Sequence, residues 1–321
     1  MSQQQVLVTG ANGFVGRALC AKAVARSFNV RGMTRSPYHL PGGINSYVLG
    51  SMDENTDWQA SLTGSGVVIH LAARVHVMQD TATDPLVEFR RVNVQGTLNL
   101  ARQAAAAGVP RFVFISSIKV NGEATKLDQP FTADDESVPL DPYGISKMEA
   151  EQGLRKIAAE TGLEVVIIRP PLVYGPGVKA NFQSMMRWLR RGVPLPLGAI
   201  NNRRSMVALD NLVDLIVTCI DHPAAANQTF LVSDGEDLST TQLLQRLGRA
   251  LGKPARLIPV PSMFLKIGAA LLGKPAIAQR LCGSLQIDIS KTQQLLGWTP
   301  PLSVDEGLKK AAEGYLREAA V

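Results

Sequence analysis

Three residues of the sequence are of the types, and at the spacing, that move a proton on and off a hydroxyl group. Tyr143 and Lys147 lie four residues apart in the segment YGISK, so in a helix both side chains lie on one face. A phenol ordinarily titrates near pH ~10, and an adjacent ammonium group lowers its pKa because it stabilises the phenolate. Ser117 follows an apolar run, and we expect its hydroxyl to hold the oxygen that Tyr143 titrates. The pattern predicts acid–base chemistry at a hydroxyl or keto carbon.

A glycine-rich turn near the N-terminus predicts a nucleotide-binding site. The segment TGANGFVG (9–16) follows a predicted strand and precedes a predicted helix. Gly10 permits a tight turn, Gly13 lets the backbone approach a pyrophosphate, and Gly16 lets the helix pack close to the sheet. The first N–H groups of the helix then face the phosphates. The expected contacts are Gly10, Asn12, Gly13, Phe14, Val15 and Gly16.

The elements that position these residues alternate along the first half of the chain. Short β-branched runs predict strands, and amphipathic segments between them predict helices. The strands are expected at 5–9, 29–33, 46–49, 67–70, 111–115 and 164–169, and the helices at 14–26, 84–107 and 141–161. This alternation indicates an α/β fold, a Rossmann-like doubly wound parallel sheet whose ligands bind at the carboxyl ends of the strands.

The second half of the chain predicts a smaller lobe. Pro and Gly become denser after residue 175, and the expected helices are 180–191, 211–221, 239–251 and 303–317. We therefore expect a dinucleotide-binding domain over 1–175 and a substrate-binding lobe over 176–321. Within 205–235 the chain is expected to return to the main sheet, because residues 229–233 have the pattern of a strand.

Composition excludes several classes of function. The hydrophobic share is 45% and the net charge is +6, with basic residues scattered along the chain, so nucleic-acid binding is not expected. Three widely spaced cysteines fit a reducing compartment and no metal site, and the N-terminus lacks a signal peptide, which predicts a cytoplasmic protein.

The apolar segment 261–273 is shorter than the roughly 20 residues needed to span a bilayer. We expect it to form a helix packed on its own protein, with a surface-associated amphipathic helix as the alternative.

The end of the second strand bears on cofactor choice. A carboxylate usually takes the adenosine ribose hydroxyls there, but this chain has Thr34 followed by Arg35. Arg35 is suited to pair with a 2′-phosphate, so the cofactor is expected to be NAD or NADP(H), with NADP(H) accepted. The alternative is that Arg35 stacks on adenine or faces solvent.

Taken together, these motifs resemble the extended short-chain dehydrogenase/reductases, and within them the UDP-glucose 4-epimerase-like enzymes. The matching segments are TGANGFVG, HLAA (70–73), NVQGT, SSIKVNG, YGISK and RPPLVYGPG (169–177), and the likeness runs over nearly the whole chain. The resemblance implies that Ser117, Tyr143 and Lys147 are catalytic. It also implies further cofactor contacts at Ser51, Met52, Leu71, Ala72, Ala73, Asn93 and Pro170, beside Tyr143 and Lys147 themselves.

The same resemblance implies a UDP-sugar substrate. The diphosphate would contact Asn181 and Arg204, with Arg280 as a second basic contact, and the backbone around Pro196 would read uracil. Asn121 replaces the family's usual tyrosine in the sugar pocket. The expected substrate contacts are therefore Ser117, Asn121, Asn181, Pro196, Arg204 and Arg280.

Two reactions fit one such site. The favoured hypothesis is reduction of a UDP-4-keto-6-deoxy-N-acetylhexosamine in surface-polysaccharide synthesis, and the alternative is 4-epimerisation of UDP-glucose or UDP-N-acetylglucosamine. A dinucleotide-sensing protein without turnover is a more distant alternative. The resemblance also implies a homodimer, formed through the helices at 84–107 and 141–161.

Overall fold

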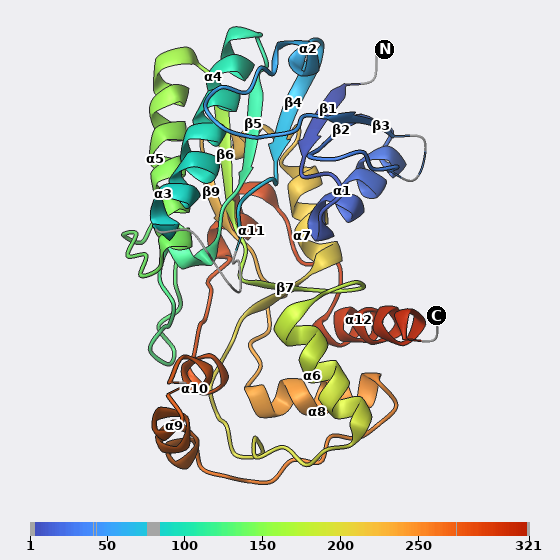
Figure 1. Ribbon diagram of the computed structural model, residues 1–321, viewed down its shortest axis with the longest axis vertical. Helices are drawn as coiled ribbons and strands as arrows, with labels where there is room; N and C mark the ends of the chain where they lie inside the picture. Colours follow the sequence, from blue (N-terminus) through green and yellow to red (C-terminus); the bar gives the residue numbers. More distant parts are fainter. Residues whose placement is uncertain (1–3, 41, 43, 76–83, 274, 320–321) are drawn as a thin grey trace.

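The structure is a computed structural model, and it describes residues 4–319 except 41, 43, 76–83 and 274. Its centre is a seven-stranded, wholly parallel sheet in the order β3-β2-β1-β4-β5-β6-β9 (Figure 1). The strands are β1 (Gln5–Thr9), β2 (Asn29–Thr34), β3 (Asn45–Val48), β4 (Ser65–His70), β5 (Arg111–Ile115), β6 (Glu164–Arg169) and β9 (Thr229–Leu231). This topology confirms the predicted doubly wound α/β fold.

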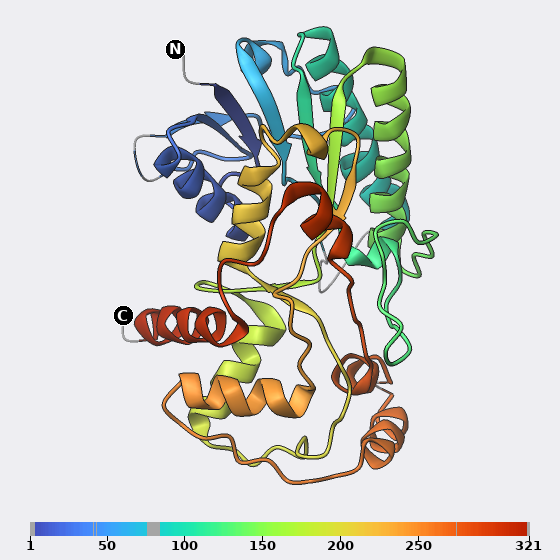
Figure 2. The same cartoon turned by 180° about the vertical axis from the view of Figure 1, so that it is seen from behind.

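Helices cover both faces of the sheet (Figures 1 and 2). Successive side chains of a strand point to opposite faces, so Val6 and Val8 of β1 lie in one buried cluster and Leu7 in another. The helices on the first face include α1 (Phe14–Ala25), α7 (Leu209–Thr218) and α11 (Ser290–Leu296). Those on the second are α2 (Gln59–Leu62), α3 (Pro85–Phe89), η1 (Arg90–Gly96), α4 (Thr97–Ala106) and α5 (Pro142–Thr161).

One expected helix is divided. The segment 84–107 was predicted as a single amphipathic helix, but its middle part, η1, is a π-helix of seven residues between α3 and α4. π-Helical turns carry one extra residue per turn and recur at functional sites. Here the turn holds Asn93, whose side chain is buried beside α5, the helix that carries the predicted acid–base pair.

A second lobe lies below the sheet in Figure 1. It is entered through the short parallel pair β7 (Leu172–Tyr174) and β8 (Met206–Ala208). Its core packs α6 (Ala180–Arg191), α8 (Thr240–Ala250) and α12 (Val304–Glu318) around Tyr174, Phe182 and Leu244. The remaining elements are the 3-10 turns η2 (Ile118–Val120) and η3 (Pro223–Ala225), and the helices α9 (Ser262–Leu271) and α10 (Pro275–Cys282).

Capping residues determine where several of the helices begin. Ser239 with Gln242, and Ser303 with Glu306, form the expected capping boxes of α8 and α12. Asp141 caps α5 by accepting a hydrogen bond from the Gly144 N–H at 2.7 Å. The start of the helix that carries the predicted acid–base pair is therefore fixed by the sequence itself.

The apolar segment 261–273 forms the expected helix, α9, which packs against α10. One side of it, including Leu265 and Ala269, is half-buried, but no residue of the helix is fully buried. Apolar composition predicted burial, although hydrophobic residues are also found on protein surfaces. Among the residues that the structure describes, no helix has both the length and the apolar character needed to cross a bilayer.

Candidate active site

The turn between β1 and α1 has the geometry of a phosphate cradle. Gly10 has a φ of +67°, and the Gly13 N–H donates to the Gly10 carbonyl at 2.9 Å. A Cβ at Gly16 would lie 2.2 Å from the Gly10 carbonyl oxygen, and one at Gly10 would lie 3.0 Å from the Ala72 nitrogen. No side chain caps α1, so its first N–H groups stay available for an anion. The residues present therefore fit the pyrophosphate of a dinucleotide.

The predicted adenosine end lies beside β2. The Thr34 hydroxyl is buried and donates to the Ser36 carbonyl at 2.9 Å, so it secures the end of the strand, while Arg35 is exposed. Ser51 is exposed, and the Met52 side chain packs in the core. The Met52 backbone comes so close to η1 that a Cβ at Gly96 would lie 3.0 Å from its carbonyl oxygen.

The end of β4 is fastened to its neighbours by a buried histidine. His70 Nδ1 lies 2.8 Å from Thr9 Oγ1, and His70 Nε2 lies 3.0 Å from Thr97 Oγ1. The Ala72 N–H donates to Thr9 Oγ1 at 3.1 Å. Burial, and then the charge of Lys147, lower the pKa of His70 to about 3, so the imidazole is neutral at physiological pH. Leu71, Ala72 and Ala73 follow at the mouth of the glycine turn.

Asn93 was predicted to contact the cofactor, and the structure gives its amide other partners. Its Oδ1 accepts from the Arg74 N–H at 2.8 Å, and its Nδ2 donates to the Arg74 carbonyl and to Ser146 Oγ, both at 3.0 Å. Asn93 therefore joins the loop after β4 to α5, and we infer a supporting role.

The predicted catalytic residues converge at the carboxyl end of β5. Lys147 is buried, and its Nζ donates to the Ile115 carbonyl at 2.9 Å and lies 6.0 Å from the centre of the Tyr143 ring. Ser117 caps η2, and its Oγ accepts from the Lys119 N–H at 3.3 Å. The Pro170 carbonyl accepts from the Ile118 N–H at 3.0 Å, which joins the segment after β6 to the same turn.

Burial sets the protonation of this pair. It lowers the pKa of Lys147 to about 7, and the nearby Glu151 carboxylate acts in the opposite direction. Burial, and then Asp141, raise the pKa of Tyr143 above its ordinary value. Asp141 is also ion-paired with Lys119. Tyr143 is therefore a neutral phenol in the ligand-free protein, so the positive charge that favours its phenolate must come from a protonated Lys147 or from a bound cation.

The buried lysine should leave a signature in the pH dependence of stability. Its pKa is about 7 in the folded protein against 10.5 as the ordinary value, so between these pH values the unfolded chain binds more protons. The free energy of unfolding should then rise with pH, by at most about 1.4 kcal/mol per pH unit from this group. Urea unfolding between pH 7 and 9 should show a steeper rise for the wild type than for Lys147→Met. Equal slopes would contradict the low pKa.

A buried charge network under α5 was missed by the sequence analysis. Glu151 is fully buried, and its carboxylate accepts from Ser116 Oγ at 2.6 Å and from Arg169 at 2.9 and 2.6 Å. Arg169 also donates to Asn121 Oδ1 at 3.0 Å. Glu151 lies four residues after Lys147, so the helical spacing that paired Lys147 with Tyr143 also indicated this carboxylate.

The side chain of Asn121 has two hydrogen-bond partners within the protein. It is buried, and besides contacting Arg169 it donates to the Thr132 carbonyl at 2.9 Å. Its side chain is thus held by hydrogen bonds to two other segments, and its contact with the sugar stays a prediction.

The predicted substrate residues of the second lobe come from three segments. Asn181 is exposed at the start of α6, and Pro196 is exposed in the loop that follows α6. Arg204 donates to the Gly283 carbonyl at 3.1 Å. Burial, and then the charge of Arg280 on α10, lower the pKa of Arg204, so the structure brings the two predicted basic contacts close together.

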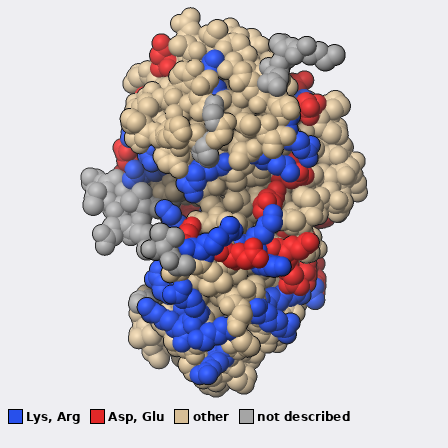
Figure 3. Space-filling view, turned by 90° about the vertical axis from the view of Figure 1, so that its right-hand side faces the viewer, with Lys and Arg blue, Asp and Glu red and all other residues tan. Residues whose placement is uncertain are grey.

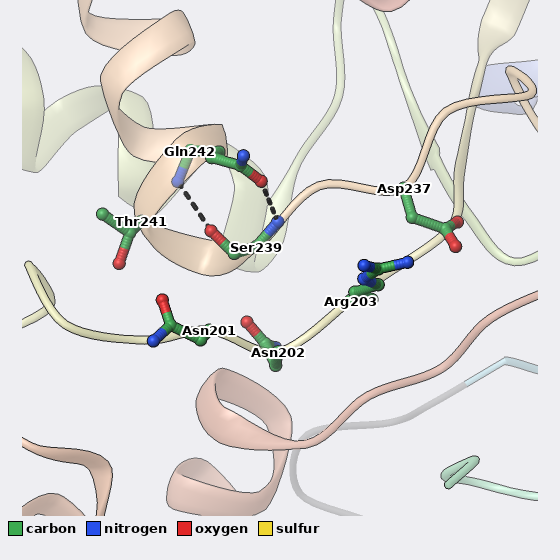
Figure 4. Close-up of a pocket in the computed structure, with 7 residues that line it drawn as sticks. All are labelled: Asn201, Asn202, Arg203, Asp237, Ser239, Thr241 and Gln242. Carbon is green, nitrogen blue, oxygen red and sulfur yellow. Dashed lines mark hydrogen bonds between the residues drawn. The ribbon is translucent and has the colours of Figure 1, made fainter. Parts of the chain in front are cut away.

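A polar cavity of about 360 Å³ lies in the second lobe beside the N-terminus of α8 (Figure 4). The capping-box bonds of Ser239 and Gln242 close one side of it, and the chain preceding Arg204 forms another. Its lining residues are Asn201, Asn202, Arg203, Asp237, Ser239, Thr241 and Gln242. Ser117, Tyr143 and Lys147 do not line it, so it is separate from the predicted catalytic centre.

The parallel sheet, the glycine cradle and the predicted Ser–Tyr–Lys constellation at the strand ends are typical of dinucleotide-dependent enzymes of the Rossmann type. Residues 6–233 match the model of the NAD dependent epimerase/dehydratase family. The chain belongs to that family and is an NAD-dependent enzyme, which confirms the resemblance found in the sequence.

Individual relatives match over the whole chain. It is 49% identical to a UDP-glucose 4-epimerase of Vibrio cholerae, over 98% of this chain and 96% of the relative. It is 28% identical to the N-acetyl-α-D-glucosaminyl-diphospho-ditrans,octacis-undecaprenol 4-epimerase of Escherichia coli O157:H7, over 96% and 94%. Among solved structures it is similar to MoeE5 in complex with UDP-glucose and NAD, with a TM-score of 0.77, 26% identity, and coverage of 99% of this chain and 100% of that one.

Proposed function

We propose that the protein is an NAD-dependent 4-epimerase of a UDP-hexose. The observation that carries the proposal is the 49% identity, over nearly the full length of both chains, to a UDP-glucose 4-epimerase. The undecaprenol-linked relative is also a 4-epimerase, and both printed substrates are sugars carried on a diphosphate. Inversion at carbon 4 is thus common to the two relatives.

The chain's own residues fit the proton transfers of this reaction. Tyr143 Oη would take the proton of the sugar 4-hydroxyl and later return it, while Ser117 Oγ holds the same oxygen. Lys147, fixed by the Ile115 carbonyl, would supply the positive charge that stabilises the phenolate. When bound in the glycine cradle, NAD supplies an acceptor for the carbon 4 hydride and a donor for its return.

Reduction of a UDP-4-keto sugar, the hypothesis favoured from the sequence, remains a prediction, as does pairing of Arg35 with a 2′-phosphate. The same acid–base residues serve both reactions. The relatives favour epimerisation, because both are 4-epimerases. A cytoplasmic location and a homodimer through the helices of 84–107 and 141–161 also remain predictions.

The two reactions differ in what they consume. We would incubate the purified protein with NAD and either UDP-glucose or UDP-N-acetylglucosamine, and follow the sugar by proton NMR. An epimerase gives the corresponding 4-epimer without net change in NAD. If neither sugar changes, while a UDP-4-keto-6-deoxy sugar is reduced at the expense of NADPH or NADH, the reductase hypothesis replaces this one.

Substrate binding should depend on the arginine at the junction of the lobes. Arg204→Ala should weaken UDP binding at least about tenfold, because a guanidinium donates two charge-assisted hydrogen bonds to a diphosphate. NAD binding should change little. Isothermal titration with UDP and with NAD measures both, and Arg203→Ala, at the exposed neighbouring residue, is the matched control. Equal losses for the two ligands would contradict the assignment.

A further inference from the structure

The helix α9 presents an apolar face to solvent. Met263, Ile267 and Leu271 are spaced four residues apart and share one side of the helix, with Phe264 beside them. Their exposed fractions are high, 59% for Phe264 and 83% for Leu271. Figures 1 and 2 place α9 at the end of the second lobe that lies farthest from the sheet.

The exposed surface extends beyond one helix. Leu272, which follows α9, and Ile277 on the adjacent α10 are also exposed. We call these six residues, Met263, Phe264, Ile267, Leu271, Leu272 and Ile277, the apolar patch. Single exposed hydrophobic residues are ordinary, but a contiguous group of large ones marks a surface that binds another molecule.

Two of the segments that build the lobe with the apolar patch are strongly basic. Residues 176–208 and 238–287 together contain 13 of the chain's 33 Lys and Arg residues and none of its 27 Asp and Glu residues. Basic residues were interpreted from the sequence as scattered, but the fold brings both segments together in the second lobe. Figure 3 shows the side of the molecule turned away from α9, and there Lys and Arg predominate over the lower part, so the basic surface continues around the lobe.

The combination of apolar and basic surface indicates which kind of partner binds the apolar patch. A nucleic acid would use the basic residues but would leave the apolar patch in water. A second copy bound through the same patch would bring two basic lobes together, and like charges repel. The surface of an anionic bilayer satisfies both features, since apolar side chains enter the interface and basic ones face the lipid head groups.

We propose that the apolar patch docks the protein peripherally on an anionic membrane. Met263, Phe264, Ile267 and Leu271 would enter the interface, and Lys266, exposed on the same helix, would face the head groups. Arg280 lies on α10, and Arg204 donates to the carbonyl of Gly283 directly after that helix, so docking would hold the predicted diphosphate contacts near the bilayer. That consequence rests on the proposed function, whereas docking itself does not.

Vesicle co-sedimentation of the full-length protein tests the docking. The vesicles contain phosphatidylcholine alone or phosphatidylcholine with phosphatidylglycerol, and no substrate is added. The wild type should bind the anionic vesicles at least about tenfold more tightly than the neutral ones, and added salt should weaken that binding. The double substitution Phe264→Glu and Ile267→Glu should lower binding to anionic vesicles at least about tenfold. Leu295→Glu with Leu316→Glu, which adds the same charge at exposed apolar residues of α11 and α12, is the matched control.

The possible outcomes distinguish membrane docking from dimer formation through the apolar patch. Unchanged thermal unfolding and unchanged turnover of UDP-sugar would show that the α9 variant is folded. Equal vesicle binding by the wild type and the α9 variant, or no binding by either, would overturn the proposal. Sedimentation velocity tests the alternative of dimer formation. If the wild type is a dimer that does not bind vesicles, and the α9 variant is a monomer, the apolar patch joins two copies of the chain and the proposal is overturned. Vesicle binding by a protein that epimerises nothing would refute only the proposed function.

Discussion

Replacement of Tyr143 by phenylalanine should lower turnover by roughly 10²- to 10⁴-fold, the usual contribution of one general acid–base group. The substitution removes only the phenolic oxygen. The ring, which packs edge-on against Phe89 at 6.1 Å between centres, should keep its place. We therefore expect kcat to fall while the affinities for UDP and NAD change little. Initial rates from the NMR assay, together with titrations of both ligands, measure this difference.

The control for this prediction is Tyr47→Phe. Tyr47 lies on the edge strand β3, is exposed, and should tolerate the loss of its hydroxyl. Turnover by Tyr143→Phe equal to that of Tyr47→Phe would remove Tyr143 from the mechanism. A loss confined to ligand affinity would instead assign it to binding.

Substitution of Glu151 by glutamine should destabilise the protein by about 3–5 kcal/mol, the usual cost of removing one partner of a buried ion pair. The change keeps the size of the side chain but removes its charge. The guanidinium of Arg169, which is almost wholly buried, would then lack a counter-charge, and Ser116 would lose its carboxylate acceptor. Urea unfolding at one fixed pH measures the difference in the free energy of unfolding.

The same helix supplies a matched control. Glu149 is two residues earlier in α5 and pairs with Arg90 at the surface, where ion pairs contribute about 0–1 kcal/mol. Glu149→Gln should therefore have little effect. If the two variants lost similar amounts of stability, the buried network would not be the stabilising feature that its geometry indicates.

The main sheet could be predicted because each of its central strands has a recognisable sequence pattern. A parallel strand covered on both faces is a continuous apolar run, and β4, β5 and β6 are such runs between helical segments. The glycine turn and the pair Tyr143 and Lys147 were equally visible, since each is local in sequence and its spacing has a direct geometric meaning.

Other features depend on contacts between distant segments, and no local pattern encodes them. Asn121 interacts with Arg169 and Thr132, and Asn93 interacts with Arg74 and Ser146, so their surroundings were known only from the structure. The π-helical turn within 84–107 left no signal in the hydrophobic pattern. The exposure of α9 was missed for a different reason, because an apolar helix can be covered by its own protein or by another surface.

The sequence alone did not identify the reaction or its substrate. Epimerisation and reduction at carbon 4 need the same proton-transferring residues, so Ser117, Tyr143 and Lys147 do not distinguish them. The preference for reduction relied on the absence of a carboxylate near Arg35, which bears on the cofactor rather than on the fate of the sugar. Comparison with whole relatives was needed to favour epimerisation.

The most direct test of the central claim follows the hydrogen on carbon 4. UDP-glucose carrying deuterium at that carbon would be incubated with the enzyme and unlabelled NAD in ordinary water. A 4-epimerase removes the label and returns it within one bound complex, so the UDP-galactose formed should retain deuterium at carbon 4. UDP-galactose that has lost its deuterium would contradict 4-epimerisation by this protein, and so would the absence of a 4-epimer from both UDP-glucose and UDP-N-acetylglucosamine labelled in the same way.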